Sequence, residues 1–122
     1  MYDKVLVCSS LAQIRSLLDT ISVRSEKVKD IDDFLESQSG MLLLDALCMN
    51  LIALGEAVKN LDKVSNGKLL PKYNQVYWGG IMRMRDKIAH HYFEIDAEVV
   101  LLTIKEDIPQ VKRVIEQMAK EL

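Results

Sequence analysis

The side chains best suited to chemistry gather between Met82 and Phe93. Both histidines of the chain, His90 and His91, lie here, and Arg85 precedes His90 by five positions. Histidine has an ordinary pKa of about 6.5, so it can take up and return a proton near neutral pH. Arginine stays charged and can bind a phosphate through two parallel hydrogen bonds. These two side chains suffice for RNA cleavage without a metal: the histidine assists the ribose 2′-hydroxyl or the leaving oxygen, and the arginine stabilises charge on the phosphorane.

The spacing of these residues leaves their relative placement open. On a continuous helix Arg85 and Tyr92 share a face, whereas His90 lies about 140° around the axis from Arg85. A long arginine side chain could bridge that gap, the helix could end near His90, or a two-fold dimer could bring two copies of the segment together. His91 also follows Arg85 at a usable distance, so spacing alone does not single out one catalytic histidine.

Two acidic residues are candidates for supporting roles. Asp86 could hydrogen-bond to His90 one turn on and raise its pKa, or it could pair with Lys87 or Arg83. Glu56 stands on an otherwise apolar segment. It either forms a salt bridge with one of the arginines or lines the reactive cleft.

Basic and aromatic residues are concentrated around the same segment. Between positions 59 and 87 the chain carries seven basic and two acidic residues, a net charge of +5, although the whole chain has a net charge of −2. Cations attract phosphates and exposed rings stack on bases, so this pattern suits a nucleic acid. We expect Lys72, Lys87 and Trp78 to contact RNA, with Arg83 supporting the site. The alternative for Trp78 and Phe93 is burial in the core.

Helices must position these residues. The chain has 122 residues, of which 49% are hydrophobic and only five are Gly and two Pro, so we expect one domain over residues 1–122 that is all-α. Periodic apolar residues predict helices over about 5–28 and 40–63, with a helical turn near 30–35 and Ser37 or Ser39 as the cap of the second helix. A break follows at 65–67, and a new segment runs from Pro71 through 78–92.

Asp96 is placed to cap the next helix, in which Pro109 either makes a kink or starts a final helix. The prediction is a bundle of four to five helices with an antiparallel up-and-down core. The segment 40–63 is apolar on most of its circumference, so it must be central or must also pack on a partner. We predict that its most apolar part, residues 41–55, is too short and too polar to span a bilayer. Cys8 and Cys48 show no metal-ligand spacing, and no signal peptide is evident, so we expect a cytoplasmic protein without metal, cofactor or membrane.

The motif Arg85-x4-His90-x-Tyr92 resembles the signature of the HEPN toxins of HEPN–MNT toxin–antitoxin pairs. The segment from Leu54 to Val58 (Leu-Gly-Glu-Ala-Val) resembles the Ile-Gly-Glu-Ala helix segment of that family. The resemblance covers roughly residues 40–115. Further residues that follow the family's order at similar spacing are Pro71, Trp78, Ile81, Met84, Asp96, Leu102 and Asp107-Ile108-Pro109.

The resemblance implies an all-α HEPN bundle, a homodimer with the two motifs in a shared cleft, and metal-independent cleavage of RNA. It also implies a toxin held in check by a cognate minimal nucleotidyltransferase antitoxin. Such antitoxins can attach AMP to the tyrosine of the motif, here Tyr92, where added bulk and negative charge beside Arg85 would block a phosphate. Two alternatives are a HEPN-fold protein that binds nucleotides or a partner without cutting RNA, and a helical dimer of structural role.

Overall fold

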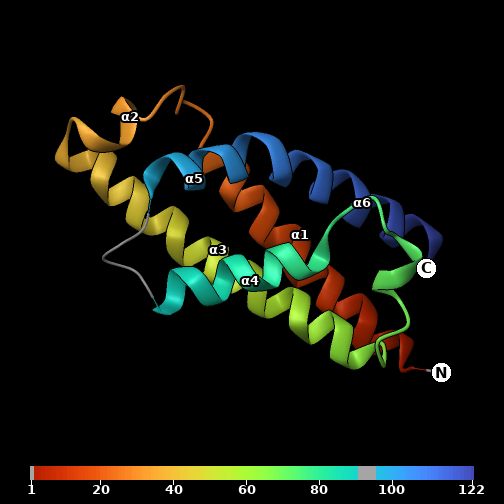
Figure 1. Ribbon diagram of the computed structural model, residues 1–122. Helices are drawn as coiled ribbons and strands as arrows, with labels where there is room; N and C mark the ends of the chain where they lie inside the picture. The colour runs from red at the N-terminus through yellow and green to blue at the C-terminus, as the bar shows by residue number, and fades with distance from the viewer. Residues whose placement is uncertain (1, 91–95) are drawn as a thin grey trace.

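Four long helical segments run back and forth in the computed structural model, which describes residues 2–90 and 96–122 (Figure 1). The first three are α1 (Lys4–Arg24), α3 (Gln38–Val64) and α4 (Trp78–His90). The fourth is built from α5 (Ala97–Leu102), the π-helical turn η3 (Thr103–Asp107) and α6 (Ile108–Glu121). A short helix, α2 (Asp32–Leu35), and a 3₁₀ turn, η1 (Leu70–Lys72), lie in the connections. The described residues contain no strand, and the predicted antiparallel all-α bundle is confirmed.

Local capping explains where three of the helices begin. Asp3 accepts a hydrogen bond from the backbone N–H of Val5 at 2.9 Å, and the Ser37 hydroxyl accepts one from Gly40 at 2.9 Å. Asp96 accepts from the backbone N–H of Glu98 at 2.8 Å. Each cap satisfies one of the backbone donors that the first turn of a helix leaves free. The predicted caps at Ser37 and Asp96 are therefore confirmed.

The central helix of the bundle is α3, which packs against α1, α2 and α4. Large side chains on this helix are fully enclosed, among them Leu47, Leu54 and Leu61. With 27 residues it is also long and apolar enough to cross a membrane by length and composition alone. The prediction that the stretch is too short and too polar concerned residues 41–55 alone, and the whole helix is longer than that stretch. The prediction that it is central is confirmed by its packing.

Some predicted boundaries differ from the structure. The first helix ends at Arg24 rather than near residue 28, although Val28 is still buried. The segment that begins at Pro71 is divided, because η1 is followed by an irregular stretch and α4 begins only at Trp78. Pro109 lies in the first turn of α6 (Ile108–Glu121), so the alternative in which it starts a final helix is confirmed. The π-helical turn η3 precedes the proline, and the N–H of Ile108 bonds to the carbonyl of Thr103 five residues back. A π turn accommodates an extra residue where regular α-helical hydrogen bonding is interrupted.

Candidate active site

The candidate site is built where α3 and α4 cross, at Gly55 and Arg85. A side-chain Cβ added at Gly55 would lie 2.2 Å from the Cβ and 2.8 Å from the Cγ of Arg85, and 3.4 Å from the carbonyl oxygen of Ile81. No such atom could fit, because carbon atoms in contact normally stay about 3.5–4.0 Å apart. Because position 55 is glycine, the Cβ and Cγ of Arg85 can pack directly on the backbone of α3; we call this contact the glycine seat.

Two carboxylates hold the guanidinium of Arg85. Its Nε lies 2.5 Å from Oε1 of Glu56, and its Nη1 lies 2.9 Å from Oδ1 of Asp86. The Nε–H is buried and is not aligned for a hydrogen bond, so the contact with Glu56 is an ion pair. The same Oδ1 of Asp86 accepts a hydrogen bond from Nζ of Lys59 at 2.9 Å. Two acids and two bases thus form a chain of alternating charge from Glu56 through Arg85 and Asp86 to Lys59, which we call the charge chain.

The charge chain fixes the ionisation of Asp86. Hydrogen bonds from Lys59 and then from Arg85 lower the pKa of its carboxyl group below the ordinary value, because both stabilise the carboxylate. The predicted pairing of Asp86 with Lys87 or Arg83 was wrong. Its ammonium partner comes instead from α3, and its guanidinium partner is the residue before it. The predicted salt bridge between Glu56 and an arginine is confirmed, and that arginine is Arg85 itself.

Arg85 remains available to a ligand in spite of these contacts. Its side chain is 26% exposed, and the side chains of Glu56 and Asp86 are 52% and 46% exposed. A guanidinium carries five N–H donors. The contacts with Glu56 and Asp86 involve Nε and Nη1 and do not use the two N–H groups of Nη2. The arrangement can therefore present a held and pre-oriented cation to a phosphate at the protein surface.

His90 is the last residue of α4 that the structure describes, five positions after Arg85. Its contact with Asp86 and its proton-transfer role stay predictions. His91 and Tyr92 lie outside the described residues, as do the roles assigned to them. Among the residues that are described, no group of three or more His, Cys, Asp or Glu side chains is arranged to hold a metal ion.

The basic residues expected to meet RNA lie at the surface, but the expected stacking residue does not. Lys72, Arg83 and Lys87 are all exposed. Arg83 and Lys87 are four residues apart on α4, so they share one face of that helix. Trp78 is only 8% exposed, and its indole N–H donates to the carbonyl oxygen of Tyr73 at 2.9 Å. Trp78 is a core residue, and its assignment as an RNA contact is corrected accordingly.

Tyr77 is the exposed aromatic residue that the sequence did not single out. Its side chain is 69% exposed, and the guanidinium carbon of Arg83 lies 5.0 Å from its ring centroid, which is cation–π geometry. The ring packs on the glycine pair at the start of α4, since a Cβ at Gly80 would lie 2.9 Å from it and one at Gly79 would lie 3.2 Å away. The two glycines thus make room for this ring.

An exposed apolar stripe runs along the first half of α3. Met41, Leu42 and Met49 are 52%, 69% and 62% exposed, and the step from Leu42 to Met49 is seven residues, or two helical turns. Because α3 and α4 run in opposite directions and cross at Gly55 and Arg85, the half of α3 before Gly55 lies on the same side of the crossing as the half of α4 after Arg85 (Figure 1). The stripe is therefore on the same side of the crossing as His90.

Comparisons with known proteins agree on one family. The family model described as "Ribonuclease HepT-like" matches residues 9–118. The chain is 36% identical over 103 residues to "Putative RNase MJ0127" of Methanocaldococcus jannaschii, covering 80% of this chain and 82% of that protein. It is 33% identical over 98 residues to "Putative RNase TTE0752" of Caldanaerobacter subterraneus subsp. tengcongensis, covering 79% and 81%. It is 32% identical over 109 residues to "Probable ribonuclease HepT" of Thermococcus cleftensis, covering 88% and 93%. No solved structure matches the chain.

Proposed function

Because the chain belongs to the HepT-like ribonuclease family, we propose that it is a metal-independent endoribonuclease that uses Arg85 and His90 to cleave RNA. The observation that carries this proposal is the environment of Arg85. A glycine seat and two carboxylates fix a partly exposed guanidinium five residues before a histidine. Preorganised charge of this kind stabilises a transition state without reorganisation during the reaction.

The proposed reaction is an attack of the ribose 2′-oxygen on the adjacent phosphorus. His90 takes the proton of the 2′-hydroxyl or gives one to the departing 5′-oxygen. The new bond joins the 2′-oxygen to phosphorus, and the bond to the 5′-oxygen breaks. The products are a 2′,3′-cyclic phosphate and a 5′-hydroxyl. Arg85 donates hydrogen bonds to the non-bridging oxygens, on which negative charge accumulates in the phosphorane.

Alanine substitution at either residue tests this assignment. Arg85→Ala and His90→Ala should each abolish RNA cleavage by metal-free protein, whereas Arg113→Ala, at an exposed position of α6, should leave cleavage unchanged. Arg85→Lys should recover little activity, because an ammonium cannot bind phosphate in the bidentate way of a guanidinium. An RNA with a single 2′-deoxyribose at the cleaved position should resist the enzyme. Full activity in either alanine variant, or cleavage at the deoxy position, would contradict the mechanism.

We also propose that the active form is a homodimer that packs through the apolar stripe of α3. Exposed Met41, Leu42 and Met49 are on the same side of the helix crossing as His90, so a second copy on this stripe would bring its own motif toward that side. Leu42→Glu should give a monomer in sedimentation velocity and should lose cleavage activity. Val23→Glu places the same charge at an equally exposed apolar position on α1, and it should stay dimeric and active. A monomeric wild-type protein that cleaves RNA would refute the shared cleft.

The biological role that we propose is that of a toxin neutralised by a cognate minimal nucleotidyltransferase. Support comes from the family and from the motif that ends in Tyr92. Expression of the wild-type chain in the cytoplasm should stop growth, and Arg85→Ala should not. Co-expression of a nucleotidyltransferase encoded beside this chain should restore growth and leave AMP on Tyr92, which mass spectrometry of the tryptic peptide would detect. Protection that persists with Tyr92→Phe would exclude modification of that tyrosine as the switch.

A non-catalytic HEPN-fold binding protein is the second candidate. The observation that favours it is the charge chain, in which carboxylates already neutralise Arg85. This alternative predicts that the purified protein binds nucleotides or a nucleotidyltransferase and leaves RNA intact. Cleavage that is lost in Arg85→Ala would exclude it.

A further inference from the structure

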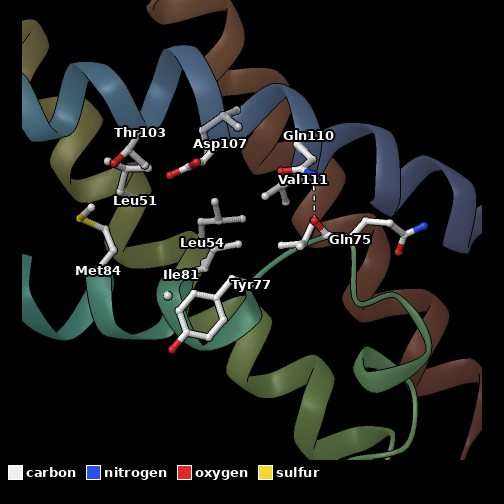
Figure 2. A pocket seen from close by; sticks show the side chains of 13 residues that line it. Leu51, Leu54, Gln75, Tyr77, Ile81, Met84, Thr103, Asp107, Gln110 and Val111 are labelled. Carbon is white, nitrogen blue, oxygen red and sulfur yellow. Dashed lines mark hydrogen bonds between the residues drawn. The ribbon is translucent and has the colours of Figure 1, made fainter.

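A pocket of about 300 Å³ lies on another side of α4, where this helix faces α3, the π-helical turn η3 and the start of α6 (Figure 2). Its volume is at the lower end of the range of small-molecule sites. Apolar side chains make most of its wall, and among them are Leu51, Leu54, Ile81, Met84 and Val111. A molecule bound there would bury an apolar body against these side chains.

The π-helical turn places a carboxylate at the mouth of this pocket. Asp107 is the last residue of η3, and its side chain points into the pocket in Figure 2. The carboxylate does not cap α6, because the chain is already helical before that helix and the N–H of Ile108 bonds to the carbonyl of Thr103. In the part of the chain that the structure describes, no ion pair or hydrogen bond engages the Asp107 carboxylate. The exposed Asp107 carboxylate thus stands at the mouth of an apolar hollow without a protein partner among the described residues.

The other polar groups at the mouth also offer acceptors. Nε2 of Gln110 donates one of its two N–H groups to the backbone oxygen of Gln75 at 2.7 Å, which leaves the amide oxygen as an acceptor and the second N–H as a donor. The hydroxyl of Thr103 donates to the carbonyl of Val99 at 2.8 Å, so its lone pairs are what it can offer a ligand. The rim around Asp107 therefore presents one negative charge, two neutral acceptors at Gln110 and Thr103, and one N–H donor. Such a set matches a group that carries several N–H donors and a positive charge.

We propose that this pocket binds a small organic molecule with an apolar body and a primary ammonium group. The apolar body fills the space between Leu54, Met84 and Val111, and the ammonium donates to the Asp107 carboxylate. An ammonium has three donors and no acceptor, which complements the acceptors of the rim. The acidic mouth disfavours phosphates and carboxylates. The pocket is therefore a site separate from the basic face of α4 that the proposed ribonuclease activity uses, and its occupancy does not depend on that activity.

Binding of 2-phenylethylamine to the full chain tests the proposal, with neutral 2-phenylethanol as the matched probe. For a ligand of this size we expect a dissociation constant of about 1 mM for the amine. The alcohol should bind about three- to tenfold more weakly, because it lacks the charge-assisted hydrogen bond. Chemical-shift changes in NMR spectra should centre on the methyl groups of Ile81, Met84 and Val111.

Two variants of equal charge locate the site. Asp107→Asn should weaken the binding of the amine about three- to tenfold and leave the affinity for the alcohol unchanged. Glu106→Gln removes a neighbouring exposed carboxylate that does not line the pocket, and it should leave the affinities for both probes unchanged. Equal affinity for amine and alcohol, an unchanged amine affinity in Asp107→Asn, shifts outside the pocket, or no saturable binding up to 10 mM would each overturn the proposal.

Discussion

Substitution of Gly55 by alanine should force α3 and α4 apart at the residue that holds Arg85. The new Cβ would start 2.2 Å from the Cβ of Arg85. This is about 1.3–1.8 Å less than an ordinary carbon contact. Rotation of the Arg85 side chain cannot relieve the overlap, because a Cβ is fixed to its own backbone. One of the two helices must therefore move.

The expected loss of stability follows from two opposing effects. Overpacking of this kind costs about 1–3 kcal/mol, and a backbone-attached contact belongs at the upper end of that range. Alanine in place of glycine inside a helix stabilises the folded state by about 1 kcal/mol, because alanine has the higher helix propensity. A net loss of about 2 kcal/mol should lower the Tm by about 6–10 °C in a chain of this size. A shift of Arg85 by about 1 Å should reduce RNA cleavage by up to about 100-fold.

Circular dichroism during heating and cleavage of a labelled RNA measure the two effects. Gly79→Ala is the matched control, since its Cβ would meet only the ring edge of the exposed Tyr77, 3.2 Å away. That variant should keep or slightly raise the Tm and should stay active. A Tm of Gly55→Ala within about 2 °C of the wild type would refute the packing argument. A lowered Tm with unchanged cleavage would refute the link between this seat and Arg85.

Three further predictions concern single side chains. The lowered pKa of Asp86 contributes stability above the ordinary aspartate value of 3.8, and that contribution is lost as the pH falls through the lowered pKa. The Tm of Asp86→Asn should thus lie below that of the wild type at pH 7, and acid titration should make the two converge. The hydrogen bond from Tyr73 to Glu121 raises the pKa of the phenol to about 12, so one late phenolate step in ultraviolet titration should vanish in Tyr73→Phe. Trp78→Phe leaves the Tyr73 carbonyl unpaired and should cost about 1–3 kcal/mol in chemical denaturation, while RNA affinity stays unchanged.

Much of the fold could be predicted from local features of the sequence. Asp96 was identified as a cap, and Ser37 was one of two candidates with Ser39, because a side-chain oxygen before an apolar periodic run is a local signal. The central position of α3 followed from apolar residues around its circumference. The π-helical turn before Pro109 could not be predicted, because the choice among a kink, a break and a π turn depends on how the whole segment packs.

The candidate site was only partly visible in the sequence. The ion pair of Glu56 with an arginine was expected, since an isolated acid on an apolar helix needs a partner. The pairing of Asp86 with Lys59 depends on the register between α3 and α4, and residues 27 positions apart carry no local sign of it. Trp78 and Tyr77 are neighbours in the chain with opposite exposures. To tell which of the two rings is buried, one must know how the first turn of α4 is oriented against the core, and the sequence does not give that orientation.

The charge chain determines which cations would make RNA binding sensitive to salt. Salt weakens such binding because each newly neutralised phosphate releases condensed counterions, at about 0.7 per phosphate for single strands. At Arg85 the carboxylates of Glu56 and Asp86 already balance the guanidinium while its Nη2 donors bind the phosphate. The site around the proposed reacting phosphate therefore adds little net positive charge, and few counterions are released there. Arg83, Lys87 and Lys72, which are exposed, would supply most of the ionic-strength dependence, and Arg85 would contribute little of it.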